Sequence, residues 1–142
     1  GIDWGNKVLA SWIEKSNIGS HCILLGERSD IVDIMNSLDL LISSSDGEAF
    51  PNVIGEAMAC GVPCVATDVG DCAELIAEAG FVTTRGRADL LASKASHIIN
   101  SSVEERRLLG LRARQQILAN YEIKSVVTMY SRLYSQVRGL KR

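Results

Sequence analysis

The sequence predicts an α/β protein in which a parallel sheet of about four short strands is flanked by helices. Short apolar runs alternate with longer stretches whose apolar residues recur at helical spacing. The short runs are hydrophobic throughout, as expected for parallel strands covered on both faces. We expect these strands over 21–25, 40–43, 63–66 and 81–83. Because no internal linker or repeat interrupts the pattern, we expect one domain over residues 1–142.

Helices are predicted from apolar spacing and from residues that begin or end a helix. Two capping boxes are expected, one formed by Asp71 with Glu74 and one by Ser102 with Glu105. A short helix is expected to start near Pro51, because proline suits the first helical position, and to end at Gly61. The other expected helices cover 6–16, 30–38, 71–78, 88–100, 102–121 and 125–137.

Composition excludes several classes of protein. With 46% hydrophobic residues the chain is globular, and no apolar run approaches the roughly 20 residues of a membrane helix. A net charge of −2 and 5% aromatic residues argue against nucleic acid as a partner. The four cysteines form no CxxC pair, so we expect buried thiols in a reducing, cytoplasmic compartment and no metal site.

Two carboxylates make residues 43–71 the candidate functional stretch. Glu48 follows a turn, and Glu56 lies eight positions later in the first turns of the helix near Pro51. The helix is followed by a buried strand over 62–66. A loop that enters a helix N-terminus between two strands is where α/β proteins hold phosphorylated ligands.

The two acids allow two interpretations. Glu56 could simply stabilise the helix dipole, which is worth about 0.3–1 kcal/mol, and Glu48 could be a solvated loop acid. A carboxylate also accepts two hydrogen bonds from a vicinal diol, although it repels phosphate. Helix-terminal N–H groups flanked by two acids therefore suit a nucleotide sugar, which combines phosphate with sugar hydroxyls. A glycosidase pair is the rival hypothesis, and the sequence supplies no aromatic substrate cleft for it.

The stretch resembles the signature of a known enzyme family. Residues 48–56 read E-A-F-P-N-V-I-G-E and match the E-x7-E motif of retaining glycosyltransferases of the GT-B fold, in the group 1 (family 4) class. Supporting matches are residues 57–63, Leu25-Gly26, residues 37–44 and residues 67–70. The resemblance covers nearly the whole chain. It implies a Rossmann-like C-terminal domain that binds the nucleotide-sugar donor.

The resemblance implies a role for each residue of the motif. Glu48 belongs to the catalytic site and contacts hydroxyls of the donor hexose, and Glu56 accepts from the ribose hydroxyls. Backbone amides after Glu48 lie along the sugar and the diphosphate. Arg28 either lies beside the base or is a plain surface charge. The implied donor-binding residues are Gly26, Arg28, Glu48, Ala49, Phe50, Asn52, Val53 and Glu56, with no metal among the ligands.

The chain departs from the family pattern at two places inside the motif region. Pro51 stands where the family often has glycine, and proline lacks an N–H, so a neighbour must supply that donor. The paired glycine after the next strand is Gly70-Asp71 here, which changes the loop. The last helix resembles one that crosses back onto the N-terminal domain of such enzymes.

The implied activity is transfer of a hexose from a UDP-, GDP- or ADP-sugar to a carbohydrate or lipid-linked acceptor. The family's first strand–helix unit, with its basic diphosphate-binding pair, and the acceptor-binding N-terminal domain have no counterpart after Gly1. We therefore expect a partial C-terminal domain that is inactive alone. Its unpaired strands are expected either to drive self-association or to bring the first two strands together.

Two further expectations concern the location of the parent protein and the alternative to a transferase. The resemblance allows peripheral association of the parent protein with the inner face of a membrane. Without the resemblance, the same elements would describe a non-catalytic, flavodoxin-like α/β module used for interaction or regulation. The module predicts no nucleotide preference and no effect of Glu56→Ala on binding, whereas the transferase predicts both.

Overall fold

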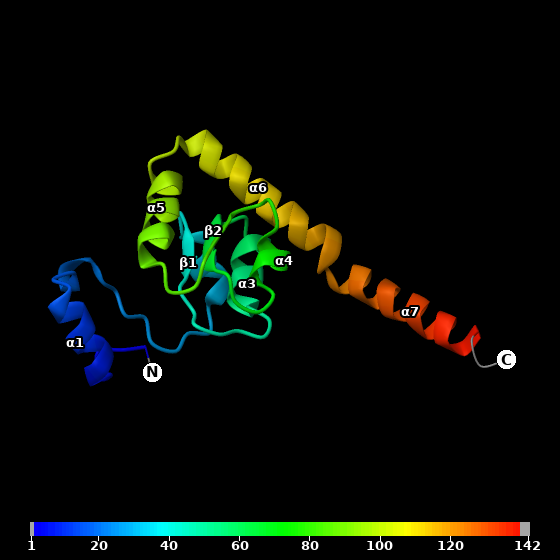
Figure 1. The fold of residues 1–142 in the computed structure, drawn as a ribbon, viewed down its shortest axis with the longest axis horizontal. Helices are drawn as coiled ribbons and strands as arrows, with labels where there is room; N and C mark the ends of the chain where they lie inside the picture. Colours follow the sequence, from blue (N-terminus) through cyan, green and yellow to red (C-terminus); the bar gives the residue numbers. More distant parts are fainter. Residues whose placement is uncertain (1, 140–142) are drawn as a thin grey trace. The chain divides into compact units, whose positions relative to one another are not determined.

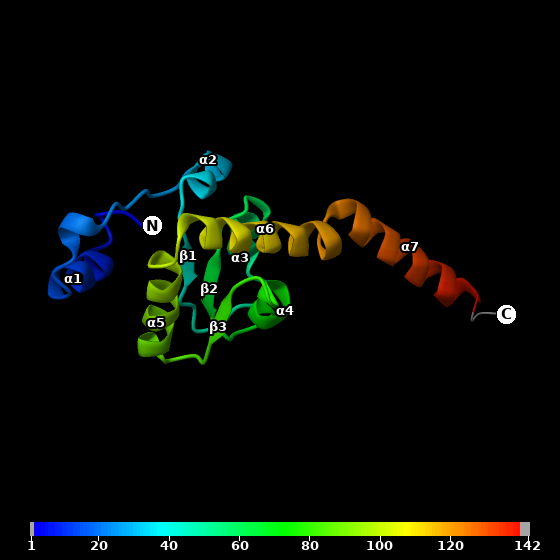
Figure 2. The same cartoon turned by 90° about the horizontal axis from the view of Figure 1, so that it is seen from above.

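The computed structural model describes residues 2–139, which divide into two compact units. The first unit ends at Ile31 and the second begins at Val32. Figure 1 labels most of the elements, and Figure 2 also labels α2 and β3. The helices are α1 (Lys7–Lys15), η1 (Gly19–His21), α2 (Ile31–Asn36), α3 (Asn52–Ala59), α4 (Cys72–Ile76), α5 (Ala88–Ile99), α6 (Val103–Asn120) and α7 (Ile123–Gly139), and the strands are β1 (Leu41–Ser43), β2 (Cys64–Thr67) and β3 (Phe81–Thr83).

The second unit is built on a parallel sheet with the strand order β1-β2-β3. The register pairs Ile42 with Val65 and Thr67 with Thr83. The middle strand β2 is buried along its whole length, which explains its unbroken apolar sequence, since helices cover it on both faces. The predicted α/β fold with a parallel sheet is confirmed.

Helices cover the sheet in two layers, which Figure 2 shows with α5 on one side and α3 and α4 on the other. The larger core cluster joins α3 and α4 to the sheet through Ile54, Met58 and Leu75, which are fully buried. The smaller cluster packs Leu91 and Ile98 of α5 against β2. Because parallel strands carry their loops at a common carboxyl edge, this layering places the loops after β1, β2 and β3 together.

Helix α6 packs closely on the turn that follows α3. Gly61 ends α3 with a φ of +78°, and a Cβ placed at Gly110 of α6 would overlap the Gly61 carbonyl oxygen. The Arg114 guanidinium donates a hydrogen bond to the Ala59 carbonyl oxygen at the end of α3. Two glycine backbones therefore touch where α6 locks α3 in place.

One predicted capping box is confirmed and the other is wrong. The Ser102 hydroxyl accepts from the Glu105 N–H at 3.2 Å, and the Glu105 carboxylate accepts from the Ser102 N–H at 2.8 Å. Asp71 precedes α4, but its side chain makes no capping bond. Its backbone (φ −90°, ψ 16°) departs from the extended conformation that a capping side chain needs.

The strand predicted over 21–25 is wrong. Within the first unit, η1 ends at His21 and residues 22–25 form no strand among the described residues. Ile23 is 84% exposed. A parallel strand requires a neighbour that pairs with its backbone, and the described sheet contains β1, β2 and β3 alone. Residues 2–139 thus form a sheet of three strands instead of the expected four. The expected direct pairing of the first two strands is also wrong.

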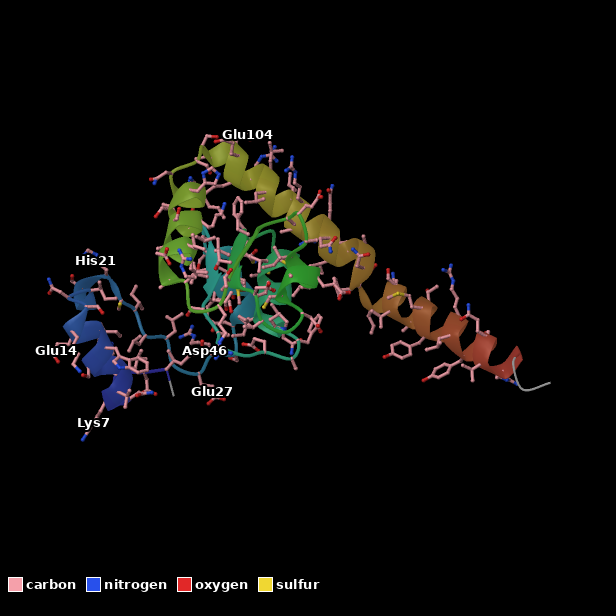
Figure 3. All side chains as sticks on the ribbon, in the orientation of Figure 1. Lys7, Glu14, His21, Glu27, Asp46 and Glu104 are labelled. Carbon is pink, nitrogen blue, oxygen red and sulfur yellow. The ribbon has the colours of Figure 1, made fainter. Side chains whose placement is uncertain are left out.

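The last helix, α7, exposes most of its large apolar side chains, among them Val127, Tyr130 and Leu133. None of its described residues is buried, and Figure 3 shows its side chains projecting along the length of the helix. Among the helices of residues 2–139, none combines the length and apolar content that a membrane span requires.

Candidate functional site

The candidate site is the loop that leaves β1 and enters α3. Glu48 lies on this loop and Glu56 on α3, and both side chains are exposed. Pro51 is fully buried just before α3 begins. The proline therefore anchors the helix start in the core, while the two carboxylates remain open to a ligand.

Backbone amides at this junction are available to a ligand. Among the described residues, no hydrogen bond occupies the N–H groups of Ala49, Phe50 and Val53. The N–H of Asn52 instead donates to the Phe50 carbonyl oxygen at 3.0 Å. The neighbour of Pro51 thus does not replace the donor that proline lacks. Three amides remain where the helix dipole is positive, a position that favours an anion.

A second loop, which follows β2, holds the first one in place. The Asp71 N–H donates to the Ala49 carbonyl oxygen at 3.2 Å. Gly70, with a φ of +51°, lies so close that a Cβ would come within 2.7 Å of the Ala49 carbonyl oxygen and closer still to that of Glu48. The departure from a paired glycine thus places the Asp71 side chain beside the site, while its backbone still binds the site loop.

One hydroxyl side chain joins β2 to the site loop, and a second one makes a bond within that loop. The Thr67 hydroxyl at the end of β2 donates to the Ser45 carbonyl oxygen at 2.6 Å. The Ser45 hydroxyl in turn donates to Oε1 of Glu48 at 2.7 Å. Neither hydroxyl was among the predicted site residues. The available signal was their place at the carboxyl ends of two strands whose loops share an edge: Thr67 is the last residue of β2, and Ser45 follows the end of β1 by two residues.

Other contacts join the site loop to β3 and α6. Asp46, labelled in Figure 3, pairs with Arg85 from the loop after β3, with 3.3 Å between the carboxylate and Nε. Phe50 packs against Tyr121 at the end of α6, with ring centroids 5.9 Å apart. Burial, together with the charges of Glu74 and Asp71, raises the pKa of Tyr121. The phenol therefore stays neutral at physiological pH.

The electrostatic environment of the site loop is acidic. Burial raises the pKa of the Cys72 thiol, and the charges of Glu48, Asp68 and Asp71 add to that rise. Cys72 is accordingly a neutral, buried thiol beside the loop. An acidic surround suits the hydroxyls of a sugar and leaves the binding of phosphate to backbone amides.

Gly26 and Arg28 belong to the first unit. Gly26 has a φ of +65°, and its N–H donates to the Ile2 carbonyl oxygen at 2.9 Å. Arg28 forms a two-bond ion pair with Asp30, which lowers the pKa of that carboxyl. Arg28 is thus engaged on the protein surface, whichever of its two predicted roles applies.

The fold and the site together define a class of protein. A parallel sheet covered by helices, with a ligand-ready helix start at its carboxyl edge, is a Rossmann-like binding domain. The model of the family described as "Glycosyl transferases group 1" matches residues 4–101, and the chain belongs to this family.

Two relatives in sequence match most of this chain. The chain is 29% identical to N-acetyl-alpha-D-glucosaminyl L-malate synthase of Bacillus anthracis over 127 residues, which cover 88% of this chain and 33% of that protein. It is 32% identical to N,N'-diacetylbacillosaminyl-diphospho-undecaprenol alpha-1,3-N-acetylgalactosaminyltransferase of Campylobacter jejuni over 115 residues, which cover 80% and 30%. The chain therefore spans about a third of the length of these relatives.

A solved structure shares the fold. Anabaena HepE in complex with UDP-glucose superimposes with a TM-score of 0.80 at 28% identity, covering 92% of this chain and 36% of that one. The fold is that of the C-terminal domain of GT-B glycosyltransferases. The resemblance inferred from the E-x7-E motif is thereby confirmed.

Proposed function

We propose that this chain is the donor-binding part of a retaining glycosyltransferase that moves a hexose from a nucleotide diphosphate sugar to a carbohydrate or lipid-linked acceptor. The observation that carries the proposal is the junction between β1 and α3. Three backbone N–H groups without partners among the described residues, those of Ala49, Phe50 and Val53, stand between Glu48 and Glu56. Amides suit the diphosphate, and carboxylates suit the sugar hydroxyls.

Each group then has a chemical task. Glu48 accepts hydrogen bonds from hydroxyls of the donor hexose, and Glu56 accepts from the ribose hydroxyls. The helix start stabilises the negative charge that develops on the leaving diphosphate. Because the Asn52 N–H is already bonded within the loop, Asn52 contributes through its exposed side chain.

The comparisons support the proposal for the parent protein. The Anabaena protein binds UDP-glucose, which supports a nucleotide-sugar donor. The name of the Campylobacter relative includes a diphospho-undecaprenol acceptor, which supports a lipid-linked acceptor and a parent that works at the inner face of a membrane. All four cysteines are free thiols, which supports a reducing, cytoplasmic compartment.

Activity requires more than these residues, so we infer that the 142-residue chain alone turns over no donor. One acceptor-binding domain and one basic diphosphate-binding pair must come from the rest of the parent protein. Binding by the isolated chain is correspondingly weak, because uncharged backbone amides donate hydrogen bonds to the diphosphate without neutralising its charge.

The test is transfer by the full-length protein that contains this chain, with α-configured UDP-, GDP- and ADP-glucose as donors. We expect donor consumption with one base and a product whose new linkage is α by NMR, as retention demands. A β-linked product would overturn the retaining assignment. Neither transfer nor donor hydrolysis with any of the three donors would overturn the transferase proposal and favour a non-catalytic module.

A further inference from the structure

Two hydrogen bonds lead from Thr67 through Ser45 to the Glu48 carboxylate, and we call this pair of bonds the relay. Thr67 ends β2, the middle strand, and its residue is 6% exposed. Its hydroxyl donates to the Ser45 carbonyl oxygen at 2.6 Å. The Ser45 hydroxyl donates to Oε1 of Glu48 at 2.7 Å. The orientation of an exposed loop carboxylate is thereby tied to the most buried strand of the sheet.

The backbone around Glu48 is held independently of this relay. Gly70 abuts the carbonyl groups of Glu48 and Ala49, and the Asp71 N–H binds the Ala49 carbonyl oxygen at 3.2 Å. With the backbone fixed from one side, the freedom that remains at Glu48 is rotation of its own side chain. The Ser45 hydroxyl restricts that rotation, because a charge-assisted hydrogen bond is shorter and stronger than one between neutral groups.

The relay orients the carboxylate without neutralising it. Ser45 and Thr67 are uncharged, and among the described residues the ion pair at this loop joins Arg85 to Asp46 and leaves Glu48 unpaired. Oε1 accepts from Ser45, so Oε2 keeps its lone pairs for a ligand hydroxyl. A carboxylate with one oxygen fixed and one open accepts a ligand hydroxyl from a single direction. That geometry discriminates between sugars that differ at one ring hydroxyl.

We propose that Ser45 and Thr67 are positioning residues that aim Oε2 of Glu48 at one hydroxyl of the donor hexose and thereby set the selectivity for the donor sugar. This inference rests on the proposed role of Glu48 at the hexose. Thr67 acts on the loop through the Ser45 carbonyl group, and Ser45 acts on the carboxylate directly. Loss of the Ser45 hydroxyl frees the Glu48 side chain to rotate, and loss of the Thr67 hydroxyl releases the Ser45 backbone that holds the Ser45 hydroxyl in place.

The test uses the full-length protein and the variants Ser45→Ala, Thr67→Val and Thr67→Ser. Probes are UDP, UDP-glucose and UDP-galactose, or the matching guanosine compounds if the protein binds guanosine. We expect Ser45→Ala to lower kcat/KM for the preferred sugar about tenfold and to bring the two epimers closer together, while the affinity for UDP alone is unchanged. Thr67→Val acts in the same direction, and Thr67→Ser restores the selectivity.

Thr83→Val is the matched control for a purely structural effect. Thr83 is the register partner of Thr67 on β3 and is equally buried, but its hydroxyl donates to the Ala66 carbonyl oxygen at 3.4 Å and leads to no site residue. We expect Thr83→Val to lower the melting temperature without changing epimer selectivity. Equal loss of selectivity in Thr83→Val and Thr67→Val would overturn the relay.

A double-mutant cycle separates this inference from the proposed function. In a Glu48→Ala background, adding Ser45→Ala should change nothing further, because its hydrogen-bond partner is gone. If Glu48→Ala itself leaves the epimer selectivity intact, the proposed role of Glu48 is wrong. If Glu48→Ala abolishes selectivity while Ser45→Ala and Thr67→Val both retain it, the relay is wrong and the role of Glu48 stands.

Discussion

Gly70 connects the fold to the site, and Gly70→Ala is the perturbation that exposes this connection. The residue has a φ of +51°, and an added Cβ would come within 2.7 Å of the Ala49 carbonyl oxygen and closer to that of Glu48. Ordinary carbon–oxygen contact would require the site loop to move by roughly 1 Å. The substitution therefore has two costs, one from backbone strain and one from the collision.

Gly86→Ala is the matched control, because Gly86 also has a positive φ, +76°, yet a Cβ there meets nothing within 4 Å. Strain alone costs about 1–2 kcal/mol in either variant. The collision adds about 1–3 kcal/mol in Gly70→Ala. At about 3 °C per kcal/mol for a chain of this size, Gly70→Ala should melt roughly 3–9 °C below Gly86→Ala.

The functional consequence of Gly70→Ala is a displaced Glu48. A misplacement of about 1 Å at a positioned group can cost on the order of 100-fold in rate, so we expect transfer by the full-length protein to fall by that order. Gly86→Ala should transfer like wild type once its lower stability is allowed for. Thermal unfolding and initial rates give both quantities. Equal melting temperatures for the two variants, or wild-type transfer by Gly70→Ala, would refute the reasoning.

Three further predictions concern the framework. Gly110→Ala should destabilise the chain by about 1–3 kcal/mol in urea unfolding, because the methyl group overlaps the backbone of Gly61. Gly55→Ala, another helix-interior change with only a 4.0 Å contact to Leu75, should stabilise the chain by about 0.5–1 kcal/mol. A change in stability of the same sign in both variants would contradict the α3–α6 geometry. Ser102→Ala should cost about 1 kcal/mol through loss of the N-cap of α6, whereas Ser135→Ala on the exposed face of α7 should be close to neutral, and an equal loss would argue against the capping box. The Arg87 guanidinium lowers the pKa of Asp89 to about 2 from 3.8, so the stability that this pair contributes is present above the higher value and is lost as the pH falls through the lower one. Asp89→Asn should therefore make the urea midpoint less dependent on pH between about pH 4 and pH 2 at low salt. A pH dependence equal to that of the wild type would show that the pair contributes nothing.

Local signals in the sequence predicted local structure well. The expected strand over 81–83 coincides with β3, and Ser102 with Glu105 forms the expected capping box. In each case the pattern and its consequence lie within a few residues. The capping box at Asp71 failed because the Asp71 backbone follows the contact of its N–H with Ala49, more than twenty positions away. A pattern of neighbouring residues cannot predict a contact over that distance in the sequence.

Pairing between residues far apart in the sequence accounts for the remaining differences between the predicted and the observed structure. Residues 21–25 are apolar enough for a strand, but a strand exists only when its neighbour does. The site shows the same division. The motif identified Glu48 and Glu56, whereas the Thr67–Ser45 bond joins residues 22 positions apart and becomes visible only when β1 and β2 are side by side. The sequence pattern therefore identified Glu48 as a site residue but could not predict how its carboxylate is oriented.

The most direct test of the central claim is calorimetric titration of UDP-, GDP- and ADP-sugars into the full-length protein, beside Glu48→Ala and Glu56→Ala variants. We expect heat with one base. Glu56→Ala should weaken both the sugar nucleotide and the free nucleoside diphosphate, because its carboxylate reads the ribose. Glu48→Ala should weaken the sugar nucleotide alone. Absence of heat with every donor, or wild-type affinity in both variants, would contradict a donor site between β1 and α3.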